Sequence, residues 1–511
     1  MSIAKTLLKG SFLRIIETFV SIAVGFFLLP FMVQQLGTEL YGIWILIGSI
    51  TFSLYLFDFG FATAVTRYIS AYIGKKEYEN VNRVVSSAFV IYSLLALIIV
   101  IATVIISTVS PYFVENDKYG STIQLLILIT GLSIAIEFPF KSFAGITTGY
   151  LRYDLLSISR IFIKLLNTSL IVYVLIHSQN LVYVALTGLI TATLSNVLYF
   201  LIAKYVFKEL SIRKEYISKD TLKSLLNYSS WAFVIDISTL LKRHGVIYII
   251  AAFLSPGILT LYYTSNRLVD YANQILYQAT SMTTPLFSRF HANNELHELR
   301  KNIIIFSRIN SLLASFTVYF FFLFGLDLIE LWMGPNFDSH LASNILKICL
   351  VANIIGYITN PISSAILAIK RPRYLAIMNI IETVLRLLFI FIFLFVFKFG
   401  ILGVAIGTMT SYLTRPYFMV KFLCKEIDMP MKSYYFSFIK PLMFVLLISS
   451  ISYYGFYMLN LENSFLTFSL QATISIISFW LFAPFILSNE EKHIIQDLLP
   501  GKLKNVMNLY L

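Results

Sequence analysis

Long apolar segments recur along the whole chain, and this feature restricts the possible fold more than any other. Each segment approaches the roughly 20 residues that an α-helix needs to cross about 30 Å of hydrocarbon. Of the 511 residues, 58% are hydrophobic and only 13% are charged. A soluble globular domain does not have this composition. The sequence therefore predicts an all-α polytopic membrane protein.

About 14 transmembrane helices are expected, because the apolar segments share the length of one membrane crossing. The first of them lacks a short apolar core followed by a small-residue cleavage site, so we interpret it as a retained helix. The helices are expected near residues 11–33, 41–64, 84–109, 122–148, 157–177, 182–205, 228–254, 258–284, 303–329, 341–367, 374–397, 400–420, 437–459 and 464–487.

Lys and Arg residues gather in every second loop, for example at Lys75 and Lys76 and again at Lys370 and Arg371. The alternate loops carry acids or little charge, as at Glu39. An excess of basic residues in one set of short loops is typical of the cytoplasmic side. The pattern predicts that both termini are cytoplasmic. It also explains the net charge of +13 without nucleic acid, with contacts to anionic lipid headgroups as a secondary effect.

An internal repeat gives the expected architecture. "LGTELYGIWIL", which starts at Leu36, aligns with "LSPGILTLYYT", which starts at Leu254, about 218 residues later. "LVYVALTGLI" aligns with "GILGVAIGTM" at nearly the same interval, so that Gly188 matches Gly407. Because each repeat holds six helices, the two repeats are parallel, and parallel repeats typically enclose a central site. We expect a six-helix lobe over 1–210, a second over 211–427, and two additional helices with a cytoplasmic tail over 428–511.

Charged residues inside the seventh and eighth predicted helices are unusual, since a charge at mid-membrane costs about 2.5 to 3.5 kcal/mol. Lys242 and Arg243 lie midway along the seventh helix, and Asp236 lies seven residues before Arg243, on nearly the same face. Charged groups in spans nearly always face a bundle interior or water. We therefore expect both helices to line a central cavity. The eighth helix adds a polar stripe at helical spacing: Asn266, Arg267, Asp270, Asn273 and Gln274.

Lys242, Arg243 and Arg267 are the residues expected to bind an anionic substrate in this cavity. Their counterparts 218 residues earlier are uncharged, which favours a function over a scaffolding role. A structural explanation remains open, because Asp236 or Asp270 could neutralise these cations in ion pairs.

Other charged residues also have two possible explanations. Asp58 could carry a coupling proton or cation, or could be the buried partner of a nearby group. Glu17 and Glu137 are isolated acids with the same two alternatives. Glu382 and Arg386 are four residues apart, the spacing of an intrahelical ion pair, and could instead be polar groups of the cavity.

No cofactor or metal is expected. Cys349 and Cys424 lack the spacing of a disulfide or metal site. The sequence also contains no Walker motif, metal cluster or nucleophile constellation, so an ATPase or an enzyme is not indicated.

Several short motifs resemble those of the polysaccharide (Wzx-type, O-antigen) flippases of the multidrug/oligosaccharidyl-lipid/polysaccharide exporter (MOP) superfamily. They are "QQLGTELYGIWILIGSI", the following "DFGFATAVTRYIS" from Asp58 to Ser70, "LWMGPNF" from Leu331, and "AIGTMTSYL". The resemblance implies a flippase that moves undecaprenyl-pyrophosphate-linked oligosaccharide repeat units from the cytoplasmic to the outer leaflet by alternating access.

The resemblance also implies a place and partners. The chain would be a multi-pass monomer of the bacterial cytoplasmic (inner) membrane that contacts membrane lipids and serves surface polysaccharide biosynthesis, such as O-antigen, lipopolysaccharide or capsule. A polymerase and a chain-length regulator of the same pathway would be its protein partners.

Two alternative functions remain open. A multidrug antiporter of the same superfamily should favour acids in its cavity, whereas basic residues are expected here. An integral membrane glycan polymerase or acyltransferase should expose acids, His or Arg in a substantial outer loop, and the outer loops predicted here are short.

Overall fold

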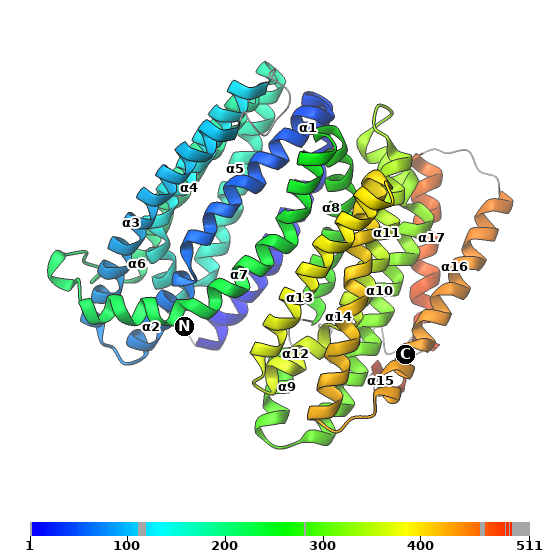
Figure 1. Cartoon of the computed structure of the whole chain (residues 1–511). Coiled ribbons are helices and arrows are strands. Elements are labelled where there is room, and N and C mark those ends of the chain that lie inside the picture. Colours follow the sequence, from blue (N-terminus) through cyan, green and yellow to red (C-terminus); the bar gives the residue numbers. More distant parts are fainter. Residues whose placement is uncertain are drawn as a thin grey trace. The chain divides into compact units, whose positions relative to one another are not determined.

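The computed structural model describes residues 3–110, 119–280, 283–459, 465–485, 487–489 and 491–492. In these residues the chain is almost entirely helical and contains no strand (Figure 1). Nine of the described helices are long and apolar enough to cross a membrane. The all-α membrane class is therefore confirmed, while the number fourteen stays a prediction.

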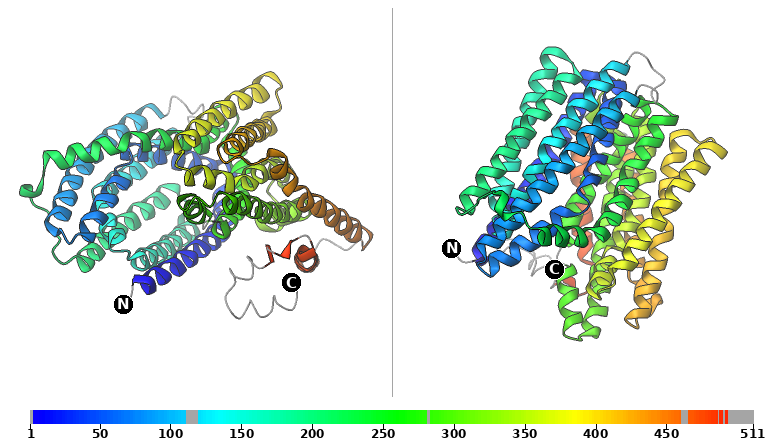
Figure 2. Two further views of the ribbon diagram at one scale, coloured as in Figure 1. Left: turned by 90° about the horizontal axis from the view of Figure 1, so that it is seen from below. Right: turned by 60° about the vertical axis from the view of Figure 1, so that its left-hand side comes forward.

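The chain divides into two compact units, Met1–Thr260 and Leu261–Leu511. In each unit the long helices run side by side (Figures 1 and 2). The lobes expected from the repeat, 1–210 and 211–427, remain a prediction about the repeat itself. The first unit contains α1 (Ile3–Ser53), the 3-10 turn η1 (Leu54–Asp58), α2 (Phe61–Gly74), α3 (Tyr78–Val109), α4 (Gly120–Gly149), α5 (Tyr153–Ser178), α6 (Leu181–Val206), α7 (Lys219–Phe253) and the first turn of α8 (Pro256–Thr280).

The second unit continues from α8 and ends with two helices beyond the repeat. It contains α9 (Thr283–Ala292), α10 (Leu296–Met333), α11 (Ser339–Ile358), α12 (Asn360–Ala368), α13 (Pro372–Phe391), α14 (Gly400–Glu426), α15 (Met431–Ser437), α16 (Ile439–Leu459) and α17 (Phe465–Phe482).

Several predicted helices are broken where the sequence allows a break. Helix α1 contains two predicted spans, which meet at Gly37, whose φ of 78° and ψ of 166° are not helical. The second span then ends in η1, and Phe59 and Gly60 adopt left-handed conformations before α2. The predicted helix 341–367 breaks at Thr359, because Pro361 cannot continue the hydrogen bonds of α11.

The two units repeat the same order of helices at the interval found in the sequence. Helix α3 begins at Tyr78 and α10 begins at Leu296, which is 218 residues later. The turn before each of these helices contains a left-handed residue, Lys76 with φ 60° and Asn294 with φ 58°. Loop geometry as well as helix order therefore repeats along the chain.

The loop after the sixth helix of each repeat is anchored in the same way. In the first unit the Asn82 side chain donates to the backbone oxygen of Glu209 at 2.9 Å. In the second unit the Arg300 guanidinium donates to the backbone oxygen of Ile427 at 2.6 Å. Both contacts join residues 127 positions apart. The repeat thus extends to individual tertiary hydrogen bonds, although the two donors differ in type.

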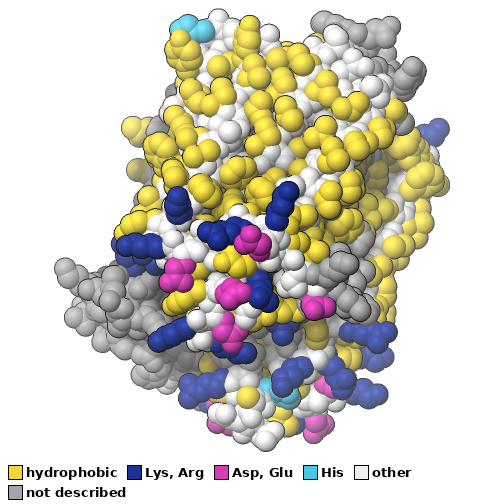
Figure 3. Space-filling model, turned by 90° about the vertical axis from the view of Figure 1, so that its left-hand side faces the viewer, with side chains coloured by type: hydrophobic (Ala, Val, Ile, Leu, Met, Phe, Trp, Pro, Cys, Tyr) yellow, Lys and Arg dark blue, Asp and Glu magenta, His cyan; other side chains and the backbone are white. Residues whose placement is uncertain are grey.

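Each unit has its own apolar core. In the first unit Tyr92, Phe138 and Phe143 are almost fully buried between α3 and α4. In the second unit Phe287 and Tyr434 are buried in the same way. On the face drawn in Figure 3, hydrophobic side chains cover the upper part and Lys and Arg gather toward the lower end. A basic band beside an apolar belt is typical of a membrane protein.

Candidate functional site

The basic residues of α7 lie where this helix packs on α1, within the first unit. The His244 ring stacks on Phe52 with 4.8 Å between ring centroids. One turn later the Tyr248 hydroxyl donates to the backbone oxygen of Ser49 at 2.8 Å. Lys242 is half-buried and Arg243 is exposed. Because His244 faces α1, the neighbouring Arg243 is left at an accessible surface of α7.

The predicted partner of Arg243, Asp236, lies in α7, but its side chain is outside the described residues. Whether the two form an ion pair therefore stays a prediction.

A second set of charges, named here the first polar cluster, consists of Asp58, Lys141, Glu137 and Tyr55. Lys141 Nζ lies 3.4 Å from an Asp58 carboxylate oxygen. The same ammonium lies 4.7 Å from the centre of the Tyr55 ring, a cation–π distance. The Tyr55 hydroxyl donates to Glu137 at 2.6 Å. Asp58 is therefore a buried partner of a cation, one of the two alternatives left open by the sequence.

Lys141 was missed by the sequence analysis, although a signal was present. Glu137 and Lys141 are four residues apart in α4, so they lie on one face of a transmembrane helix. The first polar cluster is also close to the basic stretch of α7, because the Phe52 ring lies 5.4 Å from Tyr55 and 4.8 Å from His244. Within the first unit, α1, α4 and α7 thus bring basic, acidic and aromatic side chains into one region.

Glu17, the other isolated acid, is paired with a basic residue of α5. Its carboxylate lies 3.5 Å from Arg160 Nη1. This ion pair supports the structural explanation of Glu17 left open by the sequence.

The polar stripe of α8 belongs to the second unit from Leu261 onward. The Arg267 guanidinium lies 5.0 Å from the centre of the Tyr271 ring. Asn273 donates to the side chain of Asn353 on α11 at 3.0 Å. The remaining members of the stripe, Asn266, Asp270 and Gln274, are half-buried.

Lys242 and Arg243 therefore lie in the first unit, and Arg267 lies in the second. A single cavity that contains all three cations remains a prediction.

The second polar cluster consists of Glu382, Arg386 and Arg415, and joins α13 to α14. Glu382 accepts from Arg386 Nη2 at 3.0 Å and from Arg415 Nη1 at 3.2 Å. Arg386 also faces the Tyr412 ring at 4.6 Å. Only 1% of Glu382 and 4% of Arg386 is exposed. The ion pair predicted from the four-residue spacing is confirmed, and Arg415 adds a second cation that the sequence analysis missed.

The equivalent helices of the first unit carry uncharged groups at these positions. Helix α5 begins at Tyr153 and α13 at Pro372, so the interval here is 219 residues. At that interval Arg386 corresponds to Asn167 and Arg415 corresponds to Asn196. Asn167 accepts a hydrogen bond from Thr191 at 3.2 Å. The repeat thus conserves a polar contact between the two helices, and only the second unit has charges there.

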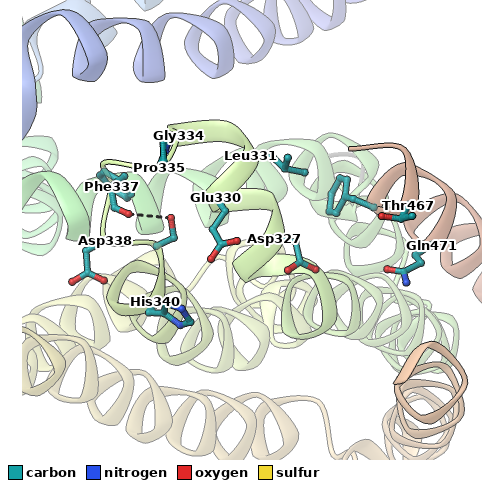
Figure 4. A pocket seen from close by; sticks show the side chains of 12 residues that line it. Asp327, Glu330, Leu331, Gly334, Pro335, Phe337, Asp338, His340, Thr467 and Gln471 are labelled. Carbon is teal, nitrogen blue, oxygen red and sulfur yellow. Dashed lines mark hydrogen bonds between the residues drawn. The ribbon is translucent and has the colours of Figure 1, made fainter. Parts of the chain in front are cut away.

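A hollow of about 510 Å³ opens in the second unit, where α10 ends, α11 begins and α17 begins. Figure 4 shows the carboxylates of Asp327, Glu330 and Asp338 around it, together with His340 and Gln471. The sequence predicts that this end of the unit is on the outer side. The sequence analysis did not identify this group, because its members come from three separate segments.

Comparisons with known proteins agree with this fold. A curated relative, an uncharacterised membrane protein of Methanocaldococcus jannaschii, is 22% identical over 400 residues, which is 72% of this chain and 74% of that protein.

Among solved structures, the lipid II flippase MurJ in an inward closed conformation matches with a TM-score of 0.68 and 19% identity, over 92% of this chain and 97% of MurJ. An inward-facing multidrug resistance transporter of the MATE family matches with a TM-score of 0.64 and 16% identity, over 81% of this chain and 94% of that chain. Both likenesses concern the fold, which is that of MOP superfamily transporters.

A family model described as "Polysaccharide biosynthesis protein" matches residues 36–342, which is more than half of the chain. It covers all the helices that carry the first polar cluster and the basic residues of α7 and α8. The chain therefore belongs to the polysaccharide biosynthesis protein family, whose fold here is that of a MOP superfamily flippase or transporter.

Proposed function

We propose that this protein moves undecaprenyl-pyrophosphate-linked oligosaccharide repeat units from the cytoplasmic to the outer leaflet. The observation that carries the proposal is the exposed guanidinium of Arg243 on a helix whose other face is packed on α1. The lipid tail of such a substrate can stay in the bilayer, while its pyrophosphate needs a polar, cationic path. Arg suits this role because its planar group can bind phosphate oxygens in pairs.

The other cations have graded availability for an anionic substrate. Arg386 is nearly inaccessible and is engaged by Glu382. Lys141 is held by Asp58. Arg243 is the most exposed of these groups, so we propose it as the principal contact, with Lys242 and Arg267 as additional contacts in a shared cavity.

A multidrug antiporter is the second candidate, and the acids Asp58 and Glu137 in the first unit are the observation that favours it. An antiporter would use such acids for a proton, a coupling cation or a cationic drug. Here Asp58 is paired with Lys141 and Glu137 accepts a hydrogen bond from Tyr55, so both acids already have a partner.

The test is complementation in a host from which the gene has been deleted. Lipid-linked repeat units and surface polysaccharide are quantified with the wild type, Arg243→Ala and Arg243→Lys at matched membrane levels. We expect glycan-linked lipid to accumulate in the deletion strain, Arg243→Ala to fail to clear it, and Arg243→Lys to be partly active because the charge remains. Arg213→Ala removes an exposed basic group from a loop and serves as the control, with full activity expected.

Two outcomes would contradict the proposal. Normal surface polysaccharide in a deletion strain without a redundant flippase would exclude this substrate. Full activity of Arg243→Ala would assign this arginine a structural role. A change in drug susceptibility without a change in polysaccharide would favour the antiporter.

A further inference from the structure

Two breaks in the helices occur at equivalent positions of the repeat. The first is at Gly37 in α1, where φ is 78° and ψ is 166°. The second is at Leu254 between α7 and α8, where φ is −122° and ψ is −107°. Leu36 and Leu254 are the aligned residues 218 positions apart, so each repeat breaks at the same turn. The charge pattern predicts that both turns are on the outer side of the membrane.

The two turns pack directly against each other within the first unit. Gly42 touches the backbone of Pro256 so closely that a Cβ on Gly42 would collide with the Pro256 carbonyl. The Thr260 hydroxyl donates to the backbone oxygen of Thr38 at 2.6 Å. A Cβ on Gly257 would lie 3.7 Å from the Thr38 hydroxyl oxygen. No side chain separates the two backbones at this point.

The contacts are reciprocal with respect to the repeat. At an interval of 218 residues, Thr38 corresponds to Pro256 and Gly42 corresponds to Thr260. Thr38 contacts Thr260, the counterpart of Gly42. Gly42 contacts Pro256, the counterpart of Thr38. Contacts of this kind are typical of an interface around a two-fold axis, where residue i meets residue j and j meets i. We call this set of residues the reciprocal turn contact.

The reciprocal turn contact can separate without leaving a buried polar group unpaired. The Thr260 hydroxyl also lies 3.3 Å from the backbone oxygen of Pro256, four residues earlier in its own helix. If the turns part, this hydroxyl keeps that acceptor. In contrast, α7 is fixed to α1 by the Tyr248 hydrogen bond and the His244 ring. The break at Leu254 therefore lies between a helix fixed to α1 and a first turn of α8 that is held by a releasable contact.

We propose that the reciprocal turn contact is a gate on the outer side, closed in this structure, that must open for cargo to leave. This inference rests on the proposed transport function for its meaning, but it concerns different residues. It also explains the glycine of the Leu-Gly-x-x-x-Tyr-Gly motif. Gly42 is required because any side chain would hold the two turns apart.

A reversible disulfide tests whether the gate moves. Thr38→Cys and Gly257→Cys are combined in a background in which the buried Cys349 and Cys424 are replaced by Ala. The spacing fits a disulfide. We expect the oxidised protein to lose the ability to clear lipid-linked glycan and to regain it on reduction. The single variants under the same oxidation should stay active.

The first unit offers a closely matched control pair. A Cβ on Gly145 would lie 3.6 Å from the Thr66 hydroxyl oxygen, so Thr66→Cys with Gly145→Cys joins α2 to α4 with nearly the same geometry. Because both helices lie in one unit away from the gate, this disulfide should leave transport unchanged. Full activity of the oxidised gate pair, or its failure to cross-link at all, would overturn the proposal.

A second measurement does not depend on the substrate. Thr260 is fully buried, so Thr260→Cys reports access to the gate by a membrane-impermeant maleimide from the outer side. We expect Gly42→Ala to raise the labelling rate about tenfold, the change that corresponds to about 1.4 kcal/mol. Gly48→Ala on the same helix is the control, because no atom lies within 4 Å of its added Cβ. Equal rates for Gly42→Ala and Gly48→Ala would overturn the gate.

The two measurements separate the gate from the proposed substrate. If the wild type clears no lipid-linked glycan, the proposed substrate is wrong, and the labelling comparison still decides the gate.

Discussion

At the scale of single residues, the second polar cluster shows how this protein keeps charges inside a membrane domain. One buried carboxylate, Glu382, accepts from two arginines, and one of these also faces the ring of Tyr412. Removing one member of a buried ion pair costs more than the pair contributes, because the remaining charge stays buried without compensation. The sequence spacing predicted the pair of Glu382 with Arg386, while Arg415 is 33 residues away in the chain and was not found.

We expect Glu382→Gln to lower the free energy of unfolding by about 3 kcal/mol, because two guanidinium groups then share a buried region without a carboxylate. The measurement is thermal unfolding of the detergent-solubilised protein, followed by intrinsic fluorescence. The double variant Glu382→Gln with Arg386→Met should lose less stability than Glu382→Gln alone, since it also removes a buried cation. Additive losses would contradict a coupled pair.

At the scale of elements, close helix packing depends on glycines that only one half of the repeat uses. On α14, a Cβ on Gly403 would lie 2.8 Å from the backbone oxygen of Phe393, and a Cβ on Gly407 would lie 2.6 Å from the backbone nitrogen of Ile390. Two glycines four residues apart let the backbones of membrane helices approach closely. The equivalent glycine of the first unit, Gly188 on α6, has no neighbour within 4 Å.

Gly407→Ala should therefore destabilise the protein by about 2 kcal/mol, because α14 must move away from α13. Gly188→Ala, at the equivalent position of the repeat, should leave stability unchanged or raise it slightly, since alanine favours helix. The midpoints of thermal unfolding of the two variants provide the comparison. Equal effects would show that the packing of α13 against α14 does not require a glycine.

At the scale of the whole molecule, the alternation of basic and acidic loops predicts which ends of the helices face the cytoplasm. The loop after α5 should lie outside and the loop after α6 inside. Ser178 and Arg213 are exposed residues at these two places.

In the background without native cysteines, Ser178→Cys should react with a membrane-impermeant maleimide in intact spheroplasts. Arg213→Cys should react only after the membrane has been opened. The measurement is labelling of the purified protein after each treatment. The reverse pattern would invert the topology, and with it the predicted outer location of both the gate and the acidic hollow.

The sequence by itself determined the features that follow from short-range physics. Apolar length predicted membrane helices, because a helix satisfies its own backbone hydrogen bonds in lipid. The 218-residue repeat predicted the order of the helices and even matching turns, as at Lys76 and Asn294. The spacing of Glu382 and Arg386 predicted their ion pair, since residues four apart lie on one face of a helix.

Only the tertiary structure decided which groups meet across distant segments. Lys141 pairs with Asp58, 83 residues away, and the Thr260 hydroxyl reaches Thr38, 222 residues away. Polar groups on several helices can be combined in many ways, and apolar periodicity does not select among them. The selection is made by the close approach of particular backbones, as at Gly42 and Pro256, and that approach depends on the packing of the whole unit.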